Sequence, residues 1–239
     1  FPLAVQRGHD AAVEFAGLDA DGADACQVRV SRDDVRRINV STRLPHGKSS
    51  AWAPLLVSPH RQVRESESLG LLTIPVGVSG QLSAAQESDS YWLQGRKGQT
   101  VRVASRTRSV GCATLLHMTL LDPAGTKVAE SEINAADEWS FDFTFPADGE
   151  YQLKVVDLLR RGGSEFGYWI EITPAGSFAV ELKADVAVRD AYVMEPGTGA
   201  CALPLQVQRF GYDGEIVLSL ANSSEDSQVE FLDGIRILN

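Results

Sequence analysis

Cysteine is scarce in this chain of 239 residues, which has only Cys26, Cys112 and Cys201. None of them forms a C-x-x-C pair, and this excludes the common zinc ribbons and thioredoxin-type redox motifs. An odd count leaves at least one thiol unpaired within the chain, and a secreted protein that relied on disulfides would have more cysteines. We expect all three to be small, buried, apolar residues, and the sequence leaves open whether any two are paired.

Signatures of catalysis and of nucleotide binding are also missing. The four histidines are dispersed: His9, His46, His60 and His117. They do not have the H-E-x-x-H spacing of a zinc peptidase, and no G-x-S-x-G is present. Gly162-Gly163 follows two arginines, but the Lys-Ser or Lys-Thr pair of a phosphate-binding loop is missing. We therefore interpret residues 158–167 as a hairpin connection with a solvated tip, and we predict no enzyme activity, catalytic residue or cofactor.

Long apolar runs and an excess of basic residues are the remaining absences. No segment approaches the roughly 20 apolar residues of a membrane span. Lys and Arg number 22 against 32 Asp and Glu, giving a formal net charge of −10. A partner with a phosphate backbone requires a clustered basic face. We therefore expect no nucleic-acid partner and no membrane span.

Alternation of apolar and polar residues dominates what is present. In residues 139–145, WSFDFTF, the four aromatic residues share one face of an extended chain. Leu116, Met118 and Leu120 alternate in the same way with His117 and Thr119. Turn sequences such as DPAG at 122–125 and PADG at 146–149 separate such runs. This pattern predicts an all-β protein built from tandem β-sandwich modules.

Polar segments without periodicity indicate the module boundaries. Residues 58–70, SPHRQVRESESLG, read as a linker, and residues 173–177, TPAGS, read as a second joint. We predict three modules: a small immunoglobulin-like module over 1–62, a central sandwich over 66–173, and a second immunoglobulin-like module over 176–239, whose completeness the sequence leaves open. The chain begins at Phe1 rather than Met, so we expect it to be a piece of a longer polypeptide with further modules as partners.

The central segment resembles a known family. Three stretches carry the resemblance: VSGQLSAAQESDSYWLQGRKGQTVRVAS at 78–105, MTLLDPAGTKVAES at 118–131, and PADGEYQLKVVD at 146–157. Together they resemble the bacterial pre-peptidase C-terminal domain. Ser88 replaces one acid of the family pattern, and the positions that match it are Asp89, Tyr91, Gly98, Gln99, Asp122, Gly125, Gly149 and Tyr151.

The flanks resemble the multi-module form of this domain in large secreted proteins of planctomycete-like bacteria. Phe1-Pro2 and Arg7-Gly8 match the opening of an IPT/TIG-like immunoglobulin module. A trailing motif is matched by Val207, Arg209, Gly211, Asp213, Gly214 and Ile216. The resemblance implies a jelly-roll-like central sandwich in an exported protein that is periplasmic, at the cell surface or extracellular. It further implies an accessory module, with any catalytic unit elsewhere in the polypeptide.

The resemblance also implies a candidate calcium site. Some relatives bind calcium through a Glu-x-Glu-x-Asn-Asp segment before the first strand. Glu65 and Glu67 occupy the first two of these positions, but Leu69 and Gly70 stand in place of the last two. Glu87 and Asp89 would complete a reduced site, although calcium prefers six to eight oxygen ligands. The alternative, which we favour at this point, is a solvated acidic linker.

Two tryptophans are candidates for ligand binding. Trp92 and Trp169 follow Tyr91 and Tyr168, which the alternation directs inward, so both tryptophans should lie on the opposite face of their strands. They would then form a platform on which sugar rings stack. The alternative, which is the commoner fate of such residues in a multi-module chain, is packing against a neighbouring module.

The predicted function follows from these two candidates and from the resemblance. We expect a non-catalytic recognition or spacing module that binds polysaccharide or an extracellular protein matrix. The alternative is a purely structural segment of an envelope or assembly protein whose modules pack on copies of themselves. Exposure of Trp92 and Trp169 would favour the first interpretation, and their burial would favour the second.

Overall fold

The computed structural model describes residues 1–15, 22–32, 35–44, 47, 50–68, 70–133, 138–182, 205–210, 215–217 and 236–237. Residues 1–174 form one compact unit and residues 175–239 form another, and the two are described separately. The described residues contain strands and two short 3-10 helices but no α-helix, which confirms the predicted all-β class. None of their helices has the length and apolar character that a membrane crossing requires.

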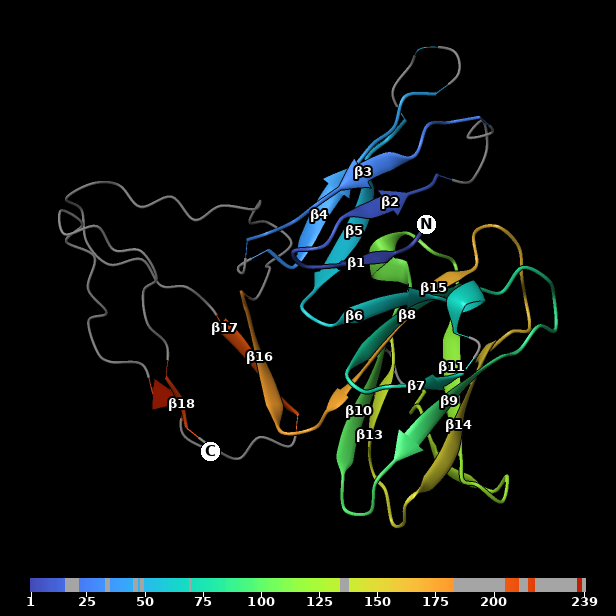
Figure 1. Ribbon diagram of the computed structural model, residues 1–239, viewed down its shortest axis with the longest axis vertical. Helices are drawn as coiled ribbons and strands as arrows, with labels where there is room; N and C mark the ends of the chain where they lie inside the picture. Colours follow the sequence, from blue (N-terminus) through green and yellow to red (C-terminus); the bar gives the residue numbers. More distant parts are fainter. Residues whose placement is uncertain are drawn as a thin grey trace. The chain divides into compact units, whose positions relative to one another are not determined.

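The centre of the first unit is a sandwich of two five-stranded sheets (Figure 1). In order across the sheet, sheet I contains β13 (Ser140–Thr144), β10 (Thr100–Arg106), β15 (Gly167–Pro174), β8 (Val76–Gln81) and β6 (Arg61–Arg64). Sheet II contains β12 (Lys127–Glu130), β11 (Leu116–Leu121), β14 (Gly149–Asp157), β9 (Asp89–Gly95) and β7 (Leu71–Leu72). Neighbouring strands are antiparallel except at one edge of each sheet, where β6 pairs with β8 and β7 with β9 in parallel.

The core of the sandwich is made by the alternate residues that the sequence pattern selects. Leu116, Met118 and Leu120 of β11 are buried, and the residues between them are half-buried. The aromatic run behaves similarly, since Phe141 and Phe145 belong to the core and Phe143 packs against it. Apolar side chains from both sheets thus meet in one layer, as a two-sheet sandwich requires.

The predicted turn at 122–125 joins β11 to β12. The Asp122 side-chain carboxylate accepts hydrogen bonds from the backbone N–H groups of Ala124 (2.9 Å) and Thr126 (2.8 Å). Gly125 has a φ of +81°, a conformation that glycine adopts without the steric cost that a Cβ imposes. The turn residues of the sequence therefore have the local roles that their chemistry predicts.

A second, smaller core lies N-terminal to the sandwich. There, β5 (Ala53–Ser58) pairs with β1 (Ala4–Gln6) and β4 (Arg37–Val40), while β2 (Ala11–Val13) pairs with β3 (Cys26–Val28). Its buried residues are Val5, Val13, Val28, Val40, Leu55 and Val57. This N-terminal part is joined to the sandwich by hydrogen bonds from Ser58 Oγ to Glu171 (2.6 Å) and from Arg64 Nη2 to the Ala12 carbonyl (2.9 Å).

The prediction of a linker over residues 58–70 is wrong. This segment contains β6, which forms an edge of sheet I, and the 3-10 helix η1 (Glu65–Glu67). The prediction was wrong because β6 is a polar edge strand in which Val63 alone reaches the core, so it carries almost no alternation. The boundary predicted between residues 62 and 66 therefore falls at this strand, and the three-module division stays a prediction.

The second unit begins within the predicted joint at 173–177. Its strand β16 (Ser177–Leu182) pairs antiparallel with β17 (Leu205–Phe210), and β18 (Ile216–Val217) pairs with β19 (Arg236–Ile237). Val207 and Arg209 of the trailing motif lie in β17, and Ile216 lies in β18. Gly211, Asp213 and Gly214 lie outside the described residues, as do Cys201, His46 and Leu69.

Candidate functional site

Three acidic side chains from separate segments converge at one end of the sandwich. Glu65 lies in η1, Glu87 in the loop before β9, and Asp89 at the first position of β9. Their carboxylate oxygens all lie within 4.8 Å of one another. Among the described residues, no other group of three acidic, histidine or cysteine side chains is close enough to share an ion. We call these three residues the acidic cluster.

Backbone and tyrosine donors hold the acidic cluster in place. Glu65 accepts a hydrogen bond from the Gln81 backbone N–H (3.1 Å), and Glu87 accepts one from the Ala84 N–H (2.7 Å). Asp89 accepts a hydrogen bond from the hydroxyl of the fully buried Tyr168 (2.5 Å). The carboxylates are thus oriented by the surrounding fold.

Electrostatics favours a proton in the acidic cluster near neutral pH. Burial, as the largest cause, and the negative charges of Glu65 and Glu87 together raise the pKa of Asp89 to about 7, although the hydrogen bond from Tyr168 acts to lower it. Burial also raises the pKa of Tyr168, and of Tyr91, whose hydroxyl is 2.5 Å from that of Tyr168. Both tyrosines therefore keep their protons and remain donors over the physiological range.

The predicted calcium ligands are brought together in part. Glu65, Glu87 and Asp89 meet, but Glu67 does not join them, because its carboxylate accepts the Arg64 backbone N–H (3.1 Å) at the start of η1. In a 3-10 helix of three residues per turn, positions i and i+2 point in different directions. Residues 65–67 do not form a free linker, because Glu65 accepts a hydrogen bond from Gln81 of β8 and thereby holds η1 against the sandwich.

The two tryptophans do not form a common platform, so this prediction is wrong. Trp92 lies on β9 of sheet II and Trp169 on β15 of sheet I, which have opposite outer faces. Trp169 is only 7% exposed, and its indole N–H donates to Gln62 of β6 (2.8 Å). For Trp169, the packing alternative is therefore the one that the structure supports. Trp92 keeps 43% of its surface exposed.

The outer face of sheet II around Trp92 is open and mostly polar. We call its outward residues on β7, β9, β14 and β11 the Trp92 face. One row runs across the strands in register and contains Leu71, Trp92, Gln152 and Leu121. Beside this row lie Ser90 and Lys154 on one side and Gln94 and Glu150 on the other. Sequence reasoning missed Leu71, because a strand of two residues is too short to show a periodic pattern.

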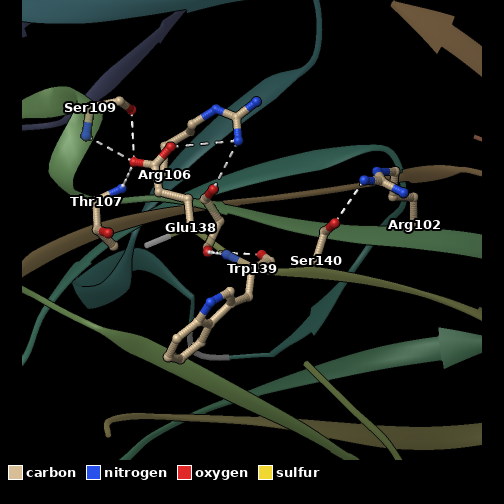
Figure 2. A network of polar contacts seen from close by, with 8 residues as sticks. Arg102, Arg106, Thr107, Ser109, Glu138, Trp139 and Ser140 are labelled. Atoms are coloured by element: carbon tan, nitrogen blue, oxygen red, sulfur yellow. Dashed lines mark hydrogen bonds and ion pairs between the residues drawn. The ribbon is translucent and has the colours of Figure 1, made fainter. Parts of the chain in front are cut away.

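Glu138, an acidic residue without a predicted role, belongs to a structural network (Figure 2). One of its oxygens accepts hydrogen bonds from the backbone N–H groups of Thr107 (2.6 Å) and Ser109 (2.9 Å) and from the Ser109 hydroxyl (2.7 Å). Its other oxygen lies 3.7 Å from Arg106 Nη1. This carboxylate therefore holds the turn after β10 in place.

The basic glycine loop is also structural. It connects β14 of sheet II to β15 of sheet I, so it crosses between the sheets and is not the predicted hairpin. Arg161 is bound to the buried Asp157 through Nε (3.0 Å) and Nη2 (3.0 Å), and its guanidinium lies over the Phe166 ring. One of the two arginines beside the glycine pair is thus bound to a carboxylate of its own chain.

No protein-family model matches the chain, and no curated protein matches it significantly. Among solved structures, the chain is similar to the pre-peptidase C-terminal domain of a collagenase from Bacillus anthracis. The two share 14% identity at a TM-score of 0.35, over 48% of this chain and 98% of that chain.

It is also similar to a periplasmic inhibitor of g-type lysozyme from Aeromonas hydrophila, at 12% identity and a TM-score of 0.35, over 48% and 98% of the two chains. A third similar structure contains a carbohydrate-binding module in complex with GlcNAc from Clostridium perfringens. There the identity is 11% and the TM-score 0.30, over 58% of this chain and 37% of that chain.

Proposed function

We propose that this chain is a non-catalytic accessory module of an exported protein, and that the Trp92 face binds an extracellular polysaccharide. The observation that carries the proposal is the position of Trp92, an exposed tryptophan at the centre of an open, polar sheet face. An indole offers a flat apolar surface on which a sugar ring stacks, while its N–H remains available as a donor. Large exposed aromatic residues on such a face are typical of a recognition surface.

The exposed surface of Trp92 is large enough to give a measurable contribution to binding. A tryptophan has roughly 250 Å² of surface, and the 43% that is exposed in Trp92 therefore amounts to about 100 Å². Covering this area would contribute about 2.5 kcal/mol at about 25 cal/mol per Å². That corresponds to a change of about 70-fold in the dissociation constant. One tryptophan thus supports weak binding to a single site, and a polymer with repeated sites would increase the avidity.

A pull-down with insoluble polysaccharides tests this proposal. We expect the chain to bind at least one of cellulose, chitin and β-1,3-glucan, and Trp92→Ala to weaken that binding by up to about 70-fold. Trp52→Ala is the matched control, because Trp52 is 71% exposed but lies before β5, outside the Trp92 face. Equal binding by wild type and Trp92→Ala would refute the proposal. Binding to collagen instead would favour a protein ligand, and self-association without ligand binding would favour the structural alternative.

A second proposal concerns the acidic cluster, which fits part of a calcium site. Three carboxylates supply between three and six of the six to eight oxygens that calcium prefers, so backbone carbonyls or water would have to complete the shell. We propose that Glu65, Glu87 and Asp89 hold the ion and that Glu67 does not. Calcium should then raise the melting temperature of the wild type and of Glu67→Gln but not that of Glu87→Gln. A calcium response that survives Glu87→Gln would refute this assignment.

A further inference from the structure

The row that crosses the Trp92 face has a defined length and composition. Leu71, Trp92 and Gln152 are direct cross-strand neighbours, and Leu121 is the neighbour of Gln152 on the far side. Adjacent strands are about 4.8 Å apart, so the row from β7 to β11 spans about 14 Å. Leu71 is 46% exposed, which places a second apolar contact directly beside Trp92. The row thus offers an apolar pair, then an amide, then a second leucine.

The direction along β9 is different. The outward neighbours of Trp92 on its own strand are Ser90 and Gln94, each about 7 Å away, and neither is apolar. Apolar surface therefore continues across the strands and is interrupted along them. Gln152 adds an amide in the middle of the row, with both donors and an acceptor for sugar hydroxyl groups.

The charges on this side of sheet II are mixed in sign. Lys154 and Glu150 lie on opposite sides of the row, two positions to either side of Gln152 on β14. Farther out, Lys127 forms an ion pair with Glu130 (2.9 Å). A charged polymer requires a stripe of one sign, and this face has none among its described residues.

From this arrangement we propose that the ligand of the Trp92 face is an uncharged, extended polysaccharide that lies across the strands, along the row from Leu71 to Leu121. The inference rests on the proposed function of the same face and adds the charge class and the direction of the ligand. The apolar side chains of the row contact sugar rings, Gln152 binds hydroxyl groups, and Ser90 and Gln94 lie beside the polymer.

Gln152 and Gln94 provide a matched pair of variants. Both are glutamines next to Trp92, one across the strands and one along them. We measure binding to insoluble cellulose, chitin and β-1,3-glucan and to anionic polygalacturonate, after confirming that each variant melts at the wild-type temperature. The expected result is that Gln152→Ala and Leu71→Ala each weaken binding to the uncharged polymer roughly threefold or more, and that Gln94→Ala and Ser90→Ala weaken it less than Gln152→Ala does. Binding should also be insensitive to salt.

The possible outcomes separate the two proposals. If Gln94→Ala weakens polysaccharide binding as much as Gln152→Ala or more, the proposed direction of the polymer is wrong. The direction is also wrong if binding depends on Trp92 but neither Gln152→Ala nor Leu71→Ala weakens it. Tighter, salt-sensitive binding to polygalacturonate overturns the charge class. In each of these cases Trp92→Ala still weakens binding and the proposed function stands. If Trp92→Ala has no effect, or no polymer of the panel binds, the proposed function itself fails.

Discussion

The buried pair of Asp157 and Arg161 should be a main source of stability of the connection between the two sheets. The Asp157 side chain is fully buried at the end of β14. Its Oδ1 accepts the backbone N–H groups of Leu159 (3.1 Å) and Arg161 (3.0 Å), and its Oδ2 accepts the N–H of Leu115 (2.9 Å). Replacement by alanine removes these three bonds together with both contacts to the guanidinium.

The magnitude follows from the partners that are left behind. Each backbone N–H bonded to a charged group contributes about 1.5 kcal/mol, and the three together give about 4 kcal/mol when allowance is made for partial access of water. The guanidinium adds less than a buried ion would, because the Arg161 side chain is 40% exposed and can be solvated. We therefore expect Asp157→Ala to lower the free energy of unfolding by about 4 kcal/mol. Arg161→Ala should lower it by only about 1 kcal/mol, because the Asp157 carboxylate keeps its three backbone N–H donors.

Urea unfolding followed by tryptophan fluorescence measures both variants and the double variant. Because the backbone bonds do not involve the guanidinium, Asp157→Ala should cost far more than Arg161→Ala, and the coupling energy should be smaller than the cost of Asp157→Ala. Burial alone would raise the pKa of Asp157, but the hydrogen bonds from Arg161 and from the backbone N–H groups lower it overall. The pair should therefore stabilise the fold above about pH 4 and lose this contribution as the pH falls further. Equal costs for the two single variants would refute the reasoning.

Three further predictions concern the core and the acidic cluster. Gly80→Ala should destabilise the sandwich by about 2 kcal/mol or more, because the added Cβ would lie 2.3 Å from the Tyr168 ring and hydroxyl. A thermal melt measures this effect, and an unchanged melting temperature would contradict the prediction. Without calcium, stability should fall as the pH rises from about 4 to about 7, because the pKa of Asp89 is about 7 in the folded protein and about 4 in the unfolded chain. Urea unfolding at a series of pH values measures this slope, which should vanish in Asp89→Asn. Glu138→Gln should destabilise the turn after β10 by about 1 kcal/mol, and hydrogen exchange at the Thr107 and Ser109 amides should accelerate, whereas unchanged protection would show that the carboxylate is dispensable.

Much of the central sandwich is determined locally by the sequence. The alternation in β11, β14 and the aromatic run predicts which side chains enter the core, because successive residues of a strand point to opposite faces. The Asp122 turn is equally local, since a side-chain carboxylate and a glycine within four residues define it. The β-sandwich that the family resemblance implies is confirmed. Membership of the family, the planctomycete-type context and the flanking immunoglobulin-like modules stay predictions, because no family model matches the chain.

Only the tertiary structure determines which distant residues meet in a site and which side chains stay exposed. Alternation places Trp92 and Trp169 outward on their strands, but it does not reveal that β9 and β15 belong to different sheets, so one tryptophan is exposed and the other is packed. Glu65 and Asp89 are 24 positions apart, and they meet only because η1, which follows β6, lies beside the start of β9. Glu67 is separated from them by a local 3-10 turn. The period of a strand fixes which face a side chain occupies, whereas the pairing of distant strands fixes what lies beside it.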